Sequence, residues 1–177
     1  MKNKLLILII TFSFFFIACD SNEDPIINIS SVDLIGTWNV TSQTIENGSI
    51  NYTVDGETIS VTYSARAEDL DFTISFSENP NIITADGSYT FIVTTTFMGQ
   101  TNTDEIEAVS IDGLDSGNWS LTNNTIKVTE TNGDAGLLTI TEYAGNILKL
   151  KAIINESETI DGETLTLSAT LYVTLEK

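Results

Sequence analysis

Carboxylates are abundant among the groups in this sequence that could do chemistry, with 25 Asp and Glu residues against 7 Lys and Arg. Two carboxylates held at a fixed separation can act as general acid and base on a glycosidic bond. Closely spaced candidates are Glu68, Asp69 and Asp71, which stand beside a predicted strand. Such a position is typical of a solvated loop. A carboxylate-based hydrolase is therefore the less favoured hypothesis, and we assign no catalytic residue.

Oxygen ligands for a cation occur in one glycine-containing loop, where Asp112, Asp115 and Asn118 lie close together in the sequence. Calcium prefers such ligands, but their spacing does not match that of an EF-hand loop, and we interpret them as turn residues. The chain has no His and a single Cys. That composition excludes Cys/His zinc sites, His-based triads and a disulfide within the chain. We expect no metal and no cofactor.

The single cysteine, Cys19, follows an N-terminal leader. Lys2 and Lys4 form a short positive end, and an almost unbroken apolar run extends from Leu5 to Ile17. The run is short for a transmembrane helix but suits the core of a signal peptide. Together with the small residue before the cysteine, it resembles a bacterial lipoprotein signal. This resemblance implies removal of residues 1–18 and acylation of Cys19, whereas an ordinary signal peptide with an unmodified cysteine is the alternative.

Residues 19–31 are predicted to form a lipidated, flexible and acidic tether. Polar and acidic residues with one proline fill the stretch from Asp20 to Pro25, a composition typical of a disordered linker. Acyl chains on Cys19 would anchor the chain to a membrane. We therefore expect a lipoprotein of the cell envelope, in the outer membrane. The acidic run resembles the surface-export signals of some Gram-negative lipoproteins, and a plain solvated spacer is the alternative.

The formal net charge of −18 limits the partners of the chain. A strongly acidic surface repels phosphate backbones, so we expect no nucleic-acid binding. It also repels anionic lipid headgroups, so membrane attachment needs a covalent anchor rather than a basic patch. The protein partner, if one exists, stays unidentified at this point.

From about residue 32 the sequence alternates apolar and polar residues, and Thr, Val, Ile, Tyr and Phe are in excess. This period of two predicts β-strands whose alternate side chains face one interior. A slip of one residue would expose the whole apolar row, so the register is firmly set. The clearest case is the last strand, in which six apolar side chains are expected to face inward: Leu165, Leu167, Ala169, Leu171, Val173 and Leu175.

Turn dipeptides separate the predicted strands. Asn47-Gly48, Asp55-Gly56 and Asn123-Asn124 predict hairpin turns, and Asp86-Gly87 is expected to open a strand. About eight to ten strands joined by tight turns imply antiparallel neighbours and an up-and-down barrel. Closure would leave no free sheet edge. We therefore predict one all-β domain over residues 32–177, with a two-sheet β-sandwich as the structural alternative.

Gly36 and Trp38 form a Gly-x-Trp unit on the first predicted strand. In this setting the chain resembles the lipocalin-like domains of bacterial lipoproteins. Three further stretches fit those domains: Phe76 through Tyr89, Gly117-Asn118-Trp119 with the Asn123-Asn124 turn, and Leu148-Lys149-Leu150. The resemblance implies a β-barrel that is plugged by Gly36, Trp38 and Trp119. The chain lacks the cysteine pair and the C-terminal helical segment of typical animal lipocalins.

The favoured hypothesis is a non-enzymatic barrel that binds or carries a small apolar or amphipathic molecule. We expect an internal cavity of several hundred Å³, on the order of known ligand sites. The candidate ligand-lining residues are Phe72, Phe76, Tyr89, Phe91 and Leu150, which the packed core could equally use. The alternative is a non-catalytic accessory or interaction module of a cell-surface complex. An exposed patch around Tyr172 or Ile92 would favour that alternative.

Overall fold

The computed structural model describes residues 27–177 except 55, 112, 131–132 and 161–162. The predicted leader at 1–18, the lipidation site Cys19 and most of the tether lie outside the described residues. Nearly all of the described chain is β-strand, and the strands belong to one antiparallel sheet. The elements are α1 (Ser31–Leu34), β1 (Gly36–Val54), β2 (Glu57–Phe76), β3 (Ile82–Phe97), β4 (Gln100–Ala108), β5 (Gly117–Thr122), β6 (Thr125–Glu130), β7 (Ala135–Tyr143), β8 (Ile147–Ile160) and β9 (Glu163–Glu176).

The sheet closes on itself because β2 pairs with both β1 and β3. Around the ring each strand lies beside its neighbour in the sequence, and β9 returns to β1. One exception occurs where β5 pairs with β3 and leaves β4 outside the ring. The described residues thus form 9 strands, all but one of which close the ring. The predicted all-β antiparallel barrel is confirmed, and these residues form no second sheet.

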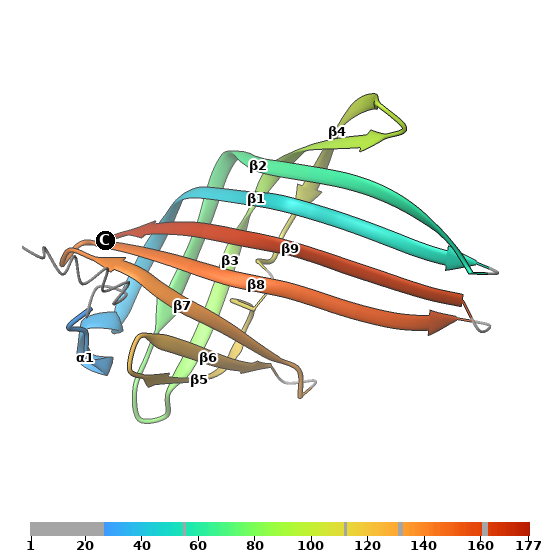
Figure 1. Cartoon of the computed structure of the whole chain (residues 1–177). Helices are drawn as coiled ribbons and strands as arrows, with labels where there is room; N and C mark the ends of the chain where they lie inside the picture. Colours follow the sequence, from blue (N-terminus) through green and yellow to red (C-terminus); the bar gives the residue numbers. More distant parts are fainter. Residues whose placement is uncertain (1–26, 55, 112, 131–132, 161–162) are drawn as a thin grey trace, which may run out of the picture.

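The long strands continue past the ring as an open sheet, which we call the arm. β7 pairs with β8 only where Thr139–Tyr143 lies opposite Leu148–Lys151, so the rest of β8 continues beside β9 alone. Figure 1 shows β1, β2, β8 and β9 extending side by side beyond the short strands β5, β6 and β7. Within the described chain, β4 and the second half of β8 are free edges of the arm. The prediction that closure leaves no free edge is therefore wrong.

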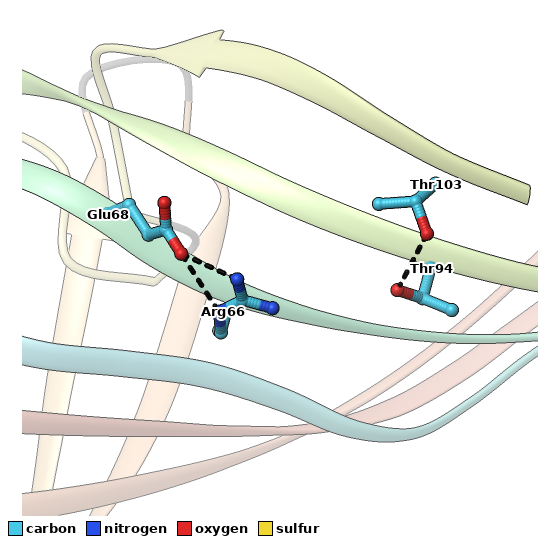
Figure 2. A network of polar contacts seen from close by, with 4 residues as sticks. All are labelled: Arg66, Glu68, Thr94 and Thr103. Carbon is cyan, nitrogen blue, oxygen red and sulfur yellow. Dashed lines mark hydrogen bonds and ion pairs between the residues drawn. The ribbon is translucent and has the colours of Figure 1, made fainter.

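The two faces of the arm differ in chemistry because side chains alternate along each strand. The outer face is polar, with cross-strand pairs such as Ser49–Ser168 at 2.9 Å and Thr94–Thr103 at 3.4 Å between hydroxyl oxygens. Figure 2 shows Thr94 and Thr103 together with Arg66 and Glu68, an exposed ion pair at 2.6 Å. The inner face continues the apolar rows of the barrel: Ile50, Val61, Tyr63, Val93, Leu165 and Leu167.

The closed end of the barrel, which we call the base, is packed around Trp38. This side chain is fully buried, and its indole nitrogen donates a 2.7 Å hydrogen bond to the carbonyl oxygen of Leu34 in α1. Burial of each large apolar side chain contributes roughly 1.5–3 kcal/mol before the loss of conformational entropy. Among the described residues, the other apolar side chains with 0% exposed surface are Leu34, Ile74, Ile83, Ile111, Leu114, Ile126, Val128, Leu138, Ile140, Leu148 and Leu175.

Two predicted turns lie inside strands. Asn47-Gly48 is an irregularity within β1, where the pairing with β2 shifts between Ile45 and Gly48. Asn47 has the positive φ of 53° that a hairpin turn would also use. Gly48 is required because a Cβ there would lie 2.5 Å from the carbonyl oxygen of Tyr63. Asp86-Gly87 likewise lies within β3, paired with β2, and opens no new strand.

Candidate functional site

A pocket opens into the barrel interior at the end of the ring remote from α1, and we call it the mouth pocket. Its volume is about 390 Å³, within the range of small-molecule sites of roughly 300–1,000 Å³. Its walls come from the inner faces of β1, β3, β6, β8 and β9, from the end of β4 and from the loop after β4. The lining residues are Gln43, Ile45, Tyr89, Phe91, Ala108, Ser110, Ile111, Asp115, Glu130, Ile154 and Leu171.

A second hollow, of about 460 Å³, adjoins the mouth pocket where β7 and β8 diverge. The two hollows share Glu130 and Ile154. Because β7 and β8 do not pair at this level, the barrel wall is split beside the pocket. The second hollow therefore lies in the side of the barrel, next to the mouth pocket.

Gln43 faces the interior because β1 contains a bulge. Trp38 and Val40 face inward, and strict alternation would place Ser42 inward next. The pairing with β9 instead shifts between Val40 and Ser42, so that Gln43 lies opposite Val173. Gln43 is 2% exposed, the one polar side chain of this kind among the described residues. Because of the bulge, Gln43 is buried on the inner face, whereas strict alternation would place it on the exposed outer face.

A chain of hydrogen bonds fixes the orientation of the Gln43 amide. The Tyr89 hydroxyl donates to the carbonyl oxygen of Ser110, and the Gln43 Nε2 donates to the Tyr89 hydroxyl at 3.3 Å. Because a tyrosine has one proton to donate, it can only accept from Gln43. The Gln43 Oε1 therefore points away from Tyr89, and it is buried without a hydrogen-bond partner. Burial raises the pKa of Tyr89 above its ordinary value.

Aromatic rings lead from the packed core to this pocket. Tyr89 meets Phe72 edge to face at a centroid distance of 5.6 Å and Phe91 at 5.0 Å. Such pairs contribute about 0.5–1.5 kcal/mol beyond the burial of their area. Phe91 stands at the outer end of this row, in the wall of the pocket. The row holds Tyr89 in place and so supports the hydrogen bond to Gln43.

The loop after β4 covers part of the barrel opening. Ile111 and Leu114 are fully buried, and the backbone amide of Leu114 donates a 2.9 Å hydrogen bond to Ile111. The loop lies against β7, where a Cβ on Gly136 would lie 2.3 Å from the Cα of Gly113. Ile111 and Asp115 of this loop line the mouth pocket. The position of the loop therefore sets the width of the pocket.

Two half-buried carboxylates, Asp115 and Glu130, line the mouth pocket together with the apolar side chains. No lysine or arginine lines it. The local charge is therefore negative, as is the charge of the whole chain. This arrangement favours a neutral or positively charged group at the polar end of the pocket.

The residues predicted from the sequence occupy two levels of the barrel. Tyr89 and Phe91 line the mouth pocket, whereas Phe72, Phe76 and Leu150 are buried in the packed core below it. Gln43, which the sequence reasoning missed, is the polar centre of the pocket. The signal was a change of phase, because the inward apolar residues of β1 are even-numbered up to Val40, odd-numbered at Ile45 and even-numbered again from Ile50.

The proposed plug residues lie at the base. Gly36 begins β1 opposite Phe76, and Trp38 is covered by α1. Trp119 is buried against Phe76 at a centroid distance of 5.4 Å, and its indole nitrogen donates a 2.9 Å hydrogen bond to the carbonyl oxygen of Ser77. The three carboxylates that were considered as hydrolytic candidates do not line the mouth pocket. Glu68, Asp69 and Asp71 are exposed at an irregularity of β2.

Within the described ranges, no group of three or more Cys, Asp or Glu residues is arranged to hold a metal ion. No helix of the described chain is long and apolar enough to cross a membrane. Comparison of the chain with protein-family models, with curated proteins and with solved structures finds no match.

Proposed function

We propose that the protein is a lipid-anchored envelope protein whose lipocalin-like barrel binds a small apolar or amphipathic molecule. The observation that carries this proposal is the mouth pocket of about 390 Å³, lined by inward side chains such as Phe91 and Leu171. A barrel with a filled base and an open upper end, lined by both apolar and polar side chains, suits one small amphipathic ligand.

The lipid anchor and the barrel have complementary roles in this proposal. A molecule released from a membrane needs an apolar site close to that membrane, and acyl chains on Cys19 would keep the barrel there. The split between β7 and β8 gives the ligand a lateral way into the interior. Leader, anchor and envelope location follow from the sequence alone, and they are part of the proposal.

A pocket-filling substitution tests the binding function. Ala108 lines the pocket at the end of β4, and its neighbour Glu107 is exposed on the opposite face. We expect Ala108→Trp to weaken binding of the fluorescent probe N-phenyl-1-naphthylamine by about tenfold, since the new ring occupies the pocket. Glu107→Trp is the matched control and should bind like the parent protein. Fluorescence titration measures both affinities.

Native mass spectrometry of the purified protein supplies an independent readout. A small molecule that co-purifies with the parent protein and with Glu107→Trp, but not with Ala108→Trp, would support a carrier. If the parent protein binds the probe without saturation, or if Ala108→Trp binds it equally well, the pocket is not a ligand site and the proposal fails.

A specific observation also favours the second hypothesis, an accessory module of a cell-surface complex. Large apolar side chains are exposed on the inner face of the arm, among them Tyr52, Ile59, Phe97 and Ile106. Exposed apolar groups on one face are typical of interaction surfaces. Tyr172 and Ile92 on the outer face are only half-buried. Loss of cross-linked partners from cells carrying Ile59→Ser, with probe binding intact, would support this second function.

A further inference from the structure

We infer that the ligand of the mouth pocket carries a hydrogen-bond donor, a hydroxyl or a protonated amine, which Gln43 Oε1 accepts. This inference rests on the proposed binding function and specifies the polar end of the ligand. The observation behind it is a buried acceptor without a partner, in a side chain that lines the mouth pocket.

The direction of this hydrogen bond follows from the relay described above. Ser110 offers only a carbonyl oxygen to Tyr89, so Tyr89 must donate to it and accept from Gln43. The Gln43 amide is thereby turned with its NH₂ toward Tyr89 and its oxygen away from it, and Gln43 lines the mouth pocket. A ligand group that can only accept, such as an ether or a carboxylate, would meet an acceptor there. A hydrogen-bond donor on the ligand would instead pair with Gln43 Oε1.

Burial makes the difference between a donor and an acceptor group on the ligand energetically important. An acceptor removed from water without a partner is costly, and a ligand that supplies the missing donor recovers this cost on binding. Gln43 is 2% exposed, so water compensates little. The carboxylates of Asp115 and Glu130 in the same lining add a preference for positive over negative charge.

A pair of probes with one alkyl chain isolates the hydrogen bond from the charge. Dodecanol can donate a proton, whereas dodecyl methyl ether can only accept. We expect dodecanol to displace N-phenyl-1-naphthylamine from the parent protein at roughly tenfold lower concentration than the ether. In a second pair, dodecylammonium should displace the fluorescent probe at a lower concentration than dodecanoate, and this difference should exceed that of the first pair. Comparison of dodecanol with dodecylammonium then distinguishes an alcohol from an amine as the preferred ligand.

Two substitutions test the assignment to Gln43. Gln43→Met keeps the length of the side chain and removes the acceptor, so the preference for dodecanol should disappear. Tyr89→Phe keeps Gln43 but removes the hydroxyl that orients its amide, so the amide can turn and the preference should shrink. Ile92→Ala, on the outer face of β3, is the control and should keep the full preference. Urea unfolding of each variant checks that the barrel is intact.

The outcomes separate this inference from the proposed function. Saturable probe binding with equal displacement by alcohol and ether would overturn the inference and leave the binding function standing. A preference that survives in both Gln43→Met and Tyr89→Phe would place the acceptor elsewhere and overturn the assignment. If no amphiphile displaces the probe, or if the probe does not bind at all, the binding function itself fails.

Discussion

The indole nitrogen of Trp38 donates a 2.7 Å hydrogen bond to the carbonyl oxygen of Leu34, four residues earlier in the chain. The amine of Lys177 lies 4.5 Å from the centroid of the same ring and donates a 2.9 Å hydrogen bond to the carbonyl oxygen of Asp33. The first strand, the short helix and the last residue of the chain are therefore joined at the base of the barrel.

Substitutions of Trp38 should separate burial from hydrogen bonding. We expect Trp38→Ala to lower the free energy of unfolding by about 3–5 kcal/mol, since a fully buried ring is lost. Trp38→Phe retains most of the apolar area but leaves the Leu34 carbonyl without its donor, at a cost of about 1–3 kcal/mol. Urea titration measures both values. Equal unfolding midpoints for the parent protein and Trp38→Ala would show that the base is not packed as described.

Replacement of Gln43 should raise stability. Gln43→Met removes a buried acceptor that lacks a partner, and the Tyr89 hydroxyl keeps its bond to Ser110. We expect the free energy of unfolding of the ligand-free protein to rise by about 1 kcal/mol. Gln43→Glu is the contrasting variant, because it keeps an acceptor, loses the donor to Tyr89 and adds a buried charge. If both variants are destabilised to the same degree, the amide is satisfied in the native protein.

Gly136 should be intolerant of any side chain. A Cβ at this position would lie 2.3 Å from the Cα of Gly113, so Gly136→Ala must displace the loop that covers the barrel opening. We expect a loss of about 1–3 kcal/mol in unfolding free energy and weaker probe binding. Leu137→Ala, at the exposed neighbouring position, should change stability by less than about 0.5 kcal/mol. Comparable losses in the two variants would mean that the loop does not rest on β7.

The proposed anchor has its own test. Cys19→Ser removes the only thiol of the chain, and with it the acceptor of the acyl chains. We expect the variant to appear in the soluble fraction after cell lysis, while the parent protein sediments with membranes. Folding should be unaffected, and the unfolding midpoint is the control. A variant that still sediments with membranes would contradict lipid anchoring at Cys19.

The alternation of apolar residues was sufficient to predict the class of fold. Along β9 the residues Ala169, Leu171, Val173 and Leu175 are buried and their neighbours are not, as the period of two requires. One buried face per strand implies one interior, and the strand count suits a ring. The position of β4 outside the ring depends on the pairing of β5 with β3, a contact between distant parts of the chain that no local pattern specifies.

Turn dipeptides were less informative, because an Asn-Gly pair serves a bulge as well as a hairpin. Both need a left-handed backbone, and Asn47 adopts it within β1. A second bulge, which no turn dipeptide marks, hid Gln43. Strict alternation from Trp38 places that residue on the outer face, and only the bulge near Thr41 turns it inward. The polar centre of the candidate site therefore depends on a backbone irregularity rather than on a motif.

The acidic residues of the arm have a further consequence. β4 carries Asp104, Glu105 and Glu107, and the second half of β8 carries Glu156 and Glu158, so both free edges bear several negative charges. An unpaired strand is a template onto which another copy can add, and like charges oppose that addition. The acids thus guard the chain against polymerisation into fibres. Without these charges, ordered aggregation of this molecule is expected to begin at the two free edges.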